Sequence, residues 1–276
     1  MIEISNVNVY DMAESIYASG YPMDVDLADK EIEIEELEMY LNGWDVPERT
    51  LNHFKRICKL GRSKDWSGHN QALTGILVSF DIKCSNKMWV ELERYKFVNF
   101  VSSQSTMHRI TEFDIKDQCN EYVWGDTIDR MNQEIGKYNY YMNKGDKNSL
   151  DLAKELRLQI LYNVPSGFEL TARLTTNYRA LKNIYNQRHN HRLPEWRMFC
   201  EWILGLPFFA EICGFEPIYP KKDTEATDVL EFNANIIAKN EDGSVVSTMD
   251  LLKELSSMWY GQPEFQTGRY DDTEDK

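Results

Sequence analysis

The sequence lacks the features that define several common classes of protein. No apolar run reaches the roughly 18 residues that a membrane-spanning helix requires. The first residues, Met1-Ile2-Glu3 onward, contain neither the basic nor the apolar region of a secretory signal. We therefore expect a cytoplasmic protein with no membrane partner.

Cysteines are few, and their spacing forms no recognisable framework. There are five, an odd number, and no two form a CxxC pair; they are Cys58, Cys84, Cys119, Cys200 and Cys213. This pattern argues against a disulfide scaffold or a zinc module and indicates a reducing compartment. We expect ordinary packing roles for them and no metal site.

Basic residues are also fewer than acidic ones. The chain has 31 Lys and Arg against 45 Asp and Glu, a net charge of −14, and such a chain repels nucleic-acid polymers. Basic residues nevertheless gather in two blocks of sequence. They are Arg94, Lys96 and Arg109 in the first block, and Arg179, Arg188, Arg192 and Arg197 in the second. A small anionic ligand therefore remains possible.

The periodicity of apolar residues predicts both strands and helices. A strand and a short helix are expected within residues 2–23, followed by an acidic helix near 31–38 and an amphipathic helix within 46–64. Strict alternation from Ile76 to Ile82 predicts a half-buried strand. Further helices are predicted at 86–97, after the N-cap Ser85, and at 125–141, 150–162, 169–187 and 194–203.

The first block combines a helix with a polar loop. Glu91, Arg94 and Tyr95 are separated by three and four positions, which places them together on the predicted helix. Residues 102–109 are dense in hydroxyl groups and end in Arg109. Such a loop can hold a phosphate, although a Ser/Thr-rich segment can equally be a plain turn.

The second block is the predicted helix 169–187, which carries polar residues on two sides. Asn177 and Arg188 lie within about 20° of each other, and Arg179 and Asn183 lie on the opposite side. A helix with two polar faces would be wedged between ligands or partners, whereas the alternative is a set of solvent-facing arginines.

Together the two blocks resemble the flavin-dependent thymidylate synthases. Gly68-His69 aligns without a gap through the strand to Arg94-Tyr95-Lys96, where the family has Arg-His-Arg. The later Asn-x-Arg, Asn and Arg of the family match Asn177-Tyr178-Arg179, Asn183 and Arg188. Two departures stand out. Tyr95 replaces the central histidine, and Lys96 replaces the second arginine, which keeps the positive charge but loses the paired N–H donors of a planar guanidinium.

The resemblance implies an α+β fold, with a mixed or antiparallel sheet flanked by long helices. The catalytic domain would be residues 1–215, with insertions near 24–45 and 110–160. Residues 216–276 would form an acidic, partly disordered extension. The active sites would be shared between the subunits of a homotetramer.

The activity that the resemblance implies is methylation of dUMP to dTMP, with methylenetetrahydrofolate and NADPH as co-substrates and FAD as cofactor. Arg188 would be catalytic, polarising the uracil. The implied FAD-binding residues are Ser19, His69, Gln71, Arg94, Tyr95, Lys96, Phe97, Asn177, Arg179 and Asn183. The implied nucleotide-binding residues are Glu91, Arg94, Ser103, Ser105, Thr106 and Arg188.

Three alternatives stay open at this stage. The rewritten Tyr95-Lys96 motif is compatible with a related flavin enzyme that transfers a one-carbon group to another pyrimidine nucleotide. A relative that binds nucleotide or flavin without catalysis is a second alternative. A metal site on His189 and His191 is a third, but their spacing suits a strand and no third ligand is obvious.

Overall fold

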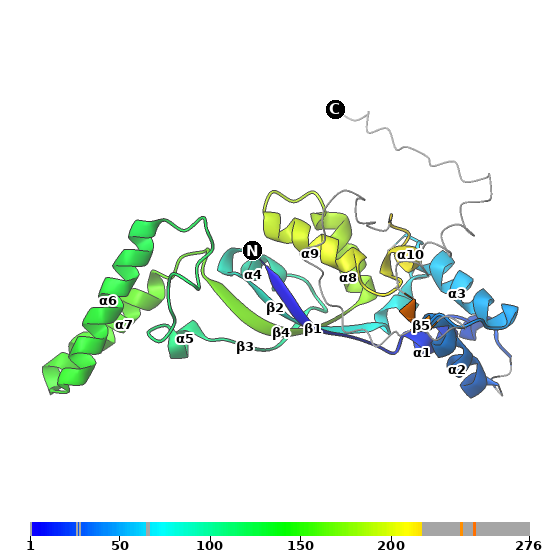
Figure 1. The fold of residues 1–276 in the computed structure, drawn as a ribbon, viewed down its shortest axis with the longest axis horizontal. Helices are drawn as coiled ribbons and strands as arrows, with labels where there is room; N and C mark the ends of the chain where they lie inside the picture. Colours follow the sequence, from blue (N-terminus) through cyan, green and yellow to red (C-terminus); the bar gives the residue numbers. More distant parts are fainter. Residues whose placement is uncertain are drawn as a thin grey trace, which may run out of the picture.

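The computed structural model describes residues 2–25, 27, 29–64, 67–216, 238–239 and 245–246. The extension predicted for residues 216–276 lies almost entirely outside them. Its described strands, β5 (Ala238–Lys239) and β6 (Val245–Val246), pair antiparallel. The molecule is elongated, with a central sheet, a helical hairpin at one end and a helical cluster at the other (Figure 1).

The central sheet has four strands in the order β1-β2-β4-β3, and every neighbouring pair is antiparallel. The strands are β1 (Glu3–Tyr10), β2 (Leu77–Ser85), β3 (Asn99–Ser103) and β4 (Glu169–Asn177). The predicted α+β class, with an antiparallel sheet flanked by helices, is therefore confirmed.

One face of the sheet forms the main core. Val78, Phe80 and Ile82 of β2 are buried with Leu174 of β4, while the intervening β2 residues are half-buried or exposed, as alternation requires. Helices α8 (Tyr178–Arg188) and α9 (Pro194–Leu204) contribute buried side chains to this core. The Phe80 ring, for example, has its centroid 4.6 Å from that of Trp202.

The helical cluster at one end contains α1 (Met12–Ala18), α2 (Lys30–Leu41) and α3 (Glu48–Gly61), close to the predicted positions. The short α10 (Phe209–Cys213) packs against α3, and η1 (Tyr21–Met23) follows α1. Acidic residues of α2 pair with α3 through Glu36–Arg49 at 2.7 Å and Glu33–His53 at 3.0 Å. The acidic run is therefore partly a helix-to-helix contact.

The helical hairpin at the other end consists of α6 (Gly125–Lys144) and α7 (Lys147–Tyr162), within the predicted insertion 110–160. The turn between them begins at Gly145, whose φ of 72° favours glycine. The hairpin has a small core of its own, to which Met131, Ile135 and Ile160 contribute with Phe168. No helix among the described residues is both long and apolar enough to span a membrane.

The prediction of one helix over residues 169–187 is wrong, because Glu169–Asn177 forms strand β4 and the helix begins only at Tyr178. β4 pairs with β2 on one side and β3 on the other, and this pairing outweighs local helical preference. Asn177 ends the strand and caps α8, its Oδ1 accepting a hydrogen bond from the amide of Ala180 at 3.0 Å.

The helix predicted for residues 86–97 is too long. Helix α4 (Asn86–Leu92) begins after the predicted cap Ser85 but ends at Leu92. Arg94, Tyr95 and Lys96 therefore lie in a turn, which we call the 94–97 turn, and not on the helix with Glu91. Phe97 ends this turn with a φ of 70°, a left-handed conformation that residues with a Cβ seldom adopt.

Candidate ligand-binding site

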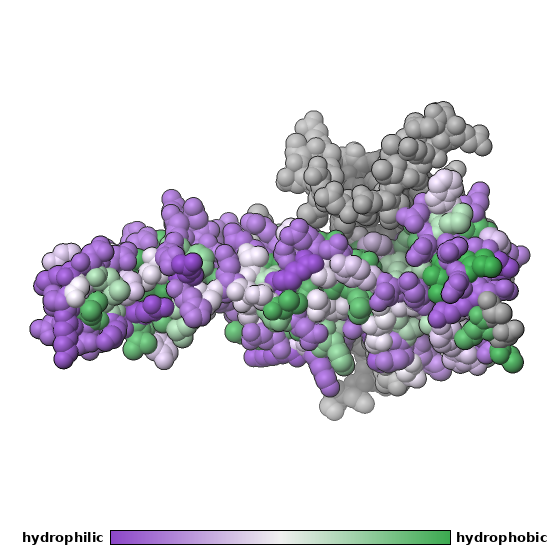
Figure 2. All heavy atoms as spheres, turned by 90° about the horizontal axis from the view of Figure 1, so that it is seen from below, coloured by the Kyte–Doolittle hydropathy of each residue, from purple (hydrophilic) through white to green (hydrophobic). Residues whose placement is uncertain are grey.

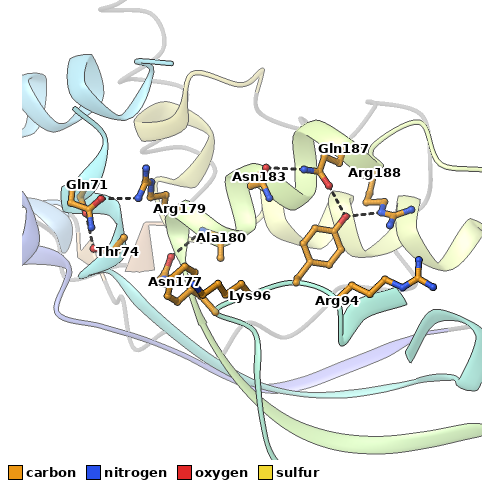
Figure 3. Close-up of a pocket in the computed structure, with 12 residues that line it drawn as sticks. Gln71, Thr74, Arg94, Lys96, Asn177, Arg179, Ala180, Asn183, Gln187 and Arg188 are labelled. Carbon is orange, nitrogen blue, oxygen red and sulfur yellow. Dashed lines mark hydrogen bonds between the residues drawn. The ribbon is translucent and has the colours of Figure 1, made fainter. Parts of the chain in front are cut away.

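A pocket of about 820 Å³ lies where the 94–97 turn faces the junction of β4 and α8 (Figure 3). The 3-10 helix η3 (Gln71–Thr74) adds a further wall. The twelve lining residues are Gln71, Thr74, Arg94, Tyr95, Lys96, Phe97, Asn177, Arg179, Ala180, Asn183, Gln187 and Arg188. The volume lies in the range of roughly 300–1,000 Å³ that is typical of sites for small molecules and cofactors.

The lining is strongly cationic. Its charged members are Arg94, Lys96, Arg179 and Arg188, and no carboxylate belongs to the wall as described. The whole chain carries a net charge of −14, so this local excess of positive charge runs against the composition. A concave cluster of arginines in such a chain favours an anionic ligand.

Arg188 is held at one end of the pocket by three neighbours. Its Nε donates a hydrogen bond to the Tyr95 hydroxyl at 2.7 Å, and its Nη1 lies 3.2 Å from Glu91 Oε2. The guanidinium carbon lies 4.9 Å from the centre of the Trp196 ring and 5.6 Å from that of Tyr95, in cation–π range. We call Glu91, Tyr95, Arg188 and Trp196 the Arg188 cluster.

Glu91 is a largely buried carboxylate that receives several donors. Oε2 accepts a hydrogen bond from Trp196 Nε1 at 3.0 Å, and Oε1 lies 3.3 Å from Lys87 Nζ. Burial by itself would raise the pKa of Glu91, but hydrogen bonds from Lys87 and Trp196 and the charge of Arg188 outweigh it and lower the pKa. Glu91 is therefore ionised at neutral pH.

A chain of hydrogen bonds connects the 94–97 turn to α8. The Tyr95 hydroxyl donates to Gln187 Oε1 at 3.1 Å, and Gln187 Nε2 donates to Asn183 Oδ1 at 2.9 Å (Figure 3). The Tyr95 hydroxyl thus accepts from Arg188 while it donates to Gln187. This double role fixes the orientation of the phenol ring at the pocket wall.

The opposite end of the pocket is built around Arg179. Its Nη1 donates to Gln71 Oε1 at 2.7 Å, which ties the start of α8 to η3. Between the two ends, Lys96 Nζ lies 5.4 Å from the centre of the Phe97 ring, and this ring is 59% exposed. The amide of Arg94 donates to Glu91 O at 3.3 Å, while its side chain lines the pocket with no ion pair or hydrogen bond to another described residue.

The pocket gathers nine of the residues that the sequence nominated for binding. They are Gln71, Arg94, Tyr95, Lys96, Phe97, Asn177, Arg179, Asn183 and Arg188. The other six nominated residues do not belong to its lining: Ser19, His69, Glu91, Ser103, Ser105 and Thr106. All four nominated residues of the second block belong to the lining, whereas five of the six excluded residues come from the first block and Ser19 precedes both.

Most of the six have local structural partners instead. Ser19 donates to Ile16 O at 2.6 Å and accepts from Arg56 Nε at 3.2 Å. Ser105 caps the short helix α5 (Thr106–Arg109), where Thr106 is the first residue, and Ser103 ends β3. His69 lies in the turn before η3, where its amide donates to Ser67 Oγ at 3.4 Å.

Two basic residues near the predicted phosphate loop also engage the protein. Arg109 pairs with Glu112 at 2.6 Å on the surface. Arg157 of α7 donates a hydrogen bond to the carbonyl of Met107. Neither side chain reaches the pocket lining, so the loop at 102–109 and the pocket are separate features of this chain.

Sequence reasoning missed Thr74, Ala180 and Gln187 in the lining. Gln187 had a signal, because it follows Arg179 and Asn183 at steps of four and so shares their helix face. The opposite face of α8 buries Leu181 and Ile184. Arg188 lies on the same side of α8 as these two residues, so polar residues do lie on two sides of the helix, and both sides contribute to one pocket.

The histidines near the end of α8 have partners within the chain. His189 Nδ1 lies 2.9 Å from Tyr185 O, and His191 Nδ1 accepts a hydrogen bond from the amide of Leu193 at 3.2 Å. In the part of the chain that the structure covers, no group of three or more His, Cys, Asp or Glu is placed to hold a metal ion.

Neither a family model nor a curated protein matches this sequence. Among solved structures, the chain is similar to thymidylate synthase X of Helicobacter pylori with FAD and dUMP, at 14% identity and a TM-score of 0.49, over 77% of this chain and 96% of that one. A second structure of that enzyme, also with FAD and dUMP, gives 16% identity and 0.45 over the same shares.

The chain is also similar to the UMP/dUMP methylase PolB of Streptomyces cacaoi bound with 5-Br dUMP. The identity is 14% and the TM-score 0.47, over 80% of this chain and 97% of that one. At these values backbone similarity says nothing about the ligand of this chain. Its ligand has to be inferred from the side chains of the pocket.

Proposed function

We propose that this protein is an FAD-dependent thymidylate synthase, which methylates dUMP to dTMP with methylenetetrahydrofolate and NADPH. One observation carries the proposal. Nine residues that the family resemblance nominates, from two blocks far apart in the sequence, line a single pocket with four cations and, within the described residues, no carboxylate. Scattered surface arginines would not converge in this way.

The residues present suit FAD. A pyrophosphate needs cationic and amide donors, and Arg179, Lys96 and Arg94 supply the charge. The rings of Tyr95 and Phe97 lie on the wall and can stack against a planar ring system. Asn177 and Asn183 add polar contacts to this set. When bound, the flavin supplies the redox and one-carbon transfer chemistry.

Arg188 is the proposed catalytic residue. Its Nε and Nη1 are engaged by Tyr95 and Glu91, so Nη2 is the nitrogen left without a described partner. A donor held in advance at a uracil carbonyl would stabilise the negative charge that develops on the oxygen during methyl transfer. The neighbouring rings of Trp196 and Tyr95 limit the access of water to the guanidinium.

The proposal includes a homotetramer in the cytoplasm whose subunits share active sites. The open rim of the pocket beside the exposed Phe97 ring is where a neighbouring subunit would complete the site. Light scattering on the purified protein measures the assembly directly. A monomer that binds FAD tightly would contradict shared sites.

The decisive experiment measures the visible absorbance of the purified protein and then its NADPH oxidation with and without dUMP. We expect a flavin spectrum and oxidation that dUMP stimulates. Protein that stays colourless after addition of FAD would contradict the proposal and favour a non-catalytic relative. A flavin spectrum combined with NADPH oxidation that no pyrimidine nucleotide stimulates would support only a flavin-binding role.

A second candidate is a related enzyme that transfers a one-carbon group to a different pyrimidine nucleotide. The observation that favours it is the bond between the Tyr95 hydroxyl and Arg188, since Tyr95 is a departure from the family motif and contacts the residue proposed to meet the base. Turnover of dCMP compared with dUMP distinguishes the two candidates. Preference for dCMP would support the second.

A further inference from the structure

Glu91 lies behind Arg188 and is not part of the pocket wall. The resemblance implies that Glu91 contacts the nucleotide, but its carboxylate is turned to Arg188, Trp196 and Lys87. We propose that Glu91 is a positioning residue, which acts on the nucleotide only through Arg188 by fixing the guanidinium so that Nη2 is left for the base. This inference rests on the proposed function, because it assumes that a pyrimidine nucleotide occupies the pocket.

The geometry of the Arg188 cluster supports a positioning role. Glu91 contacts Nη1, Tyr95 contacts Nε, and the guanidinium carbon lies over the Trp196 ring. An arginine side chain has many rotamers, and contacts at two nitrogens and with an aromatic ring restrict which of them it can adopt. The cluster is well shielded, since the side chains of Glu91 and Arg188 are 13% and 21% exposed.

Electrostatics give the positioning role a distinctive signature. A carboxylate beside an anion-binding pocket repels the ligand, so if Glu91 acted only as a charge, its removal would tighten the binding of every anion. If Glu91 positions Arg188, its removal weakens binding of the base, which Arg188 contacts, and leaves binding of the sugar phosphate unchanged. The two roles therefore predict changes of opposite sign for a ligand that has a base.

The experiment compares two ligands on the purified protein with its bound cofactor. Isothermal titration gives Kd for dUMP and for 2-deoxyribose 5-phosphate, which has the same sugar and phosphate but no base. The ratio of the two constants measures what the base contributes. In Glu91→Gln we expect the Kd for dUMP to rise about tenfold, because Arg188 would no longer be held for its charged hydrogen bond to the base, and such a bond contributes about a factor of ten or more to binding. The Kd for the sugar phosphate should stay the same or fall.

Lys87→Ala is the matched control. Lys87 contacts the other carboxylate oxygen of Glu91, Oε1, and lies on the exposed side of α4. Its removal should leave the base contribution within about twofold, as is usual for an exposed pair. Equal effects of Lys87→Ala and Glu91→Gln would show that loss of any charge on α4 is sufficient, and would overturn the inference.

A double mutant separates positioning from a purely structural effect. In an Arg188→Ala background dUMP should bind no more tightly than the sugar phosphate, and Glu91→Gln should leave the ratio of the two Kd values unchanged, since the residue through which Glu91 acts is gone. A further loss in that background, or equal weakening of both ligands by Glu91→Gln alone, would also overturn the inference.

Different results would refute the proposed enzymatic activity and the positioning role of Glu91. Wild-type protein that prefers dUMP to the sugar phosphate but does not methylate it would refute the thymidylate synthase and leave the role of Glu91 testable by the same ratios. Wild-type protein with no preference for the base would refute the positioning role itself.

Discussion

The carboxylate of Glu195 accepts two buried hydrogen bonds from Ser85, one from the backbone amide at 2.9 Å and one from the hydroxyl at 2.7 Å. Ser85 is also the N-cap of α4, where its Oγ accepts from the amide of Met88 at 3.2 Å. These contacts join the end of β2 to the first turn of α9. The helix that carries Trp196 is thereby aligned with the one that carries Glu91.

Glu195→Ala should destabilise the fold. The substitution leaves the amide and the hydroxyl of Ser85 buried without their acceptor, and we expect a loss of about 2–4 kcal/mol in the free energy of unfolding. Urea denaturation measures the change. Glu201→Ala, at an exposed position of the same helix, is the control and should alter stability by less than about 0.5 kcal/mol. Equal effects would mean that the Ser85 contact contributes little.

Arg179→Ala should weaken FAD binding. The change removes one of four cations from the pocket together with the bond to Gln71, and we expect a loss of about 1.5–3 kcal/mol in the free energy of FAD binding. Quenching of flavin fluorescence on titration of apoprotein measures it. Arg130→Ala, at an exposed position of α6, should have no effect. If the affinity for FAD is unchanged in Arg179→Ala, then FAD does not bind at this end of the pocket.

Arg188→Ala should keep its flavin and lose the nucleotide affinity that depends on the base, so that dUMP binds no more tightly than its sugar phosphate. The proposed flavin contacts come from the 94–97 turn and from Asn177, Arg179 and Asn183, whereas Arg188 is proposed to contact the base. Visible absorbance and equilibrium binding of dUMP measure the two properties separately. If Arg188→Ala turns over dUMP at the normal rate, the assignment of the second block is wrong.

The free energy of unfolding should decrease as the pH rises through the alkaline range. Burial raises the pKa of the Cys58 thiol from 9.0 to about 12. Between these values the unfolded chain has lost the thiol proton and the folded chain has kept it, so unfolding becomes easier as pH rises. Each such thiol contributes a slope of up to about 1.4 kcal/mol per pH unit.

Urea denaturation from pH 8 to 10.5 measures this slope, and Cys58→Ala should make it shallower. The comparison uses the slope and not the stability at one pH, because the substitution also leaves a small cavity. Identical slopes in the two proteins would show that the thiol of Cys58 does not determine the pH dependence.

The sequence indicated most elements, but it extended one helix beyond Leu92 and predicted a helix over the residues that form β4. Leu170, Leu174 and Tyr178 are spaced by four, as on a helix, yet Leu170, Ala172 and Leu174 also alternate, as on a strand. Local spacing cannot separate these cases, and the pairing of β4 with β2 and β3 decides between them. The cap residue Asn177 was the signal that a helix starts there.

The same limit applies to the candidate site. The order of the motif residues identified most of the pocket wall, because binding an anionic ligand needs arginine, lysine and amide side chains, and these can be recognised in the sequence. It could not show that Arg94, Tyr95 and Lys96 leave the helix, since the end of α4 at Leu92 depends on the turn that Phe97 closes. Nor could it show that Glu91 and Arg188, 97 positions apart, form a pair.

Figure 2 shows polar side chains over much of one face of the molecule, interrupted by small apolar areas. One apolar side chain on the rim of the pocket, Phe97, is unusual in its backbone. A non-glycine residue in the left-handed region carries a penalty of about 1–2 kcal/mol. Selection for stability alone would favour glycine at this position. A lineage that kept the protein but abandoned its ligand should therefore drift to glycine or asparagine here, which makes residue 97 a marker of a working site.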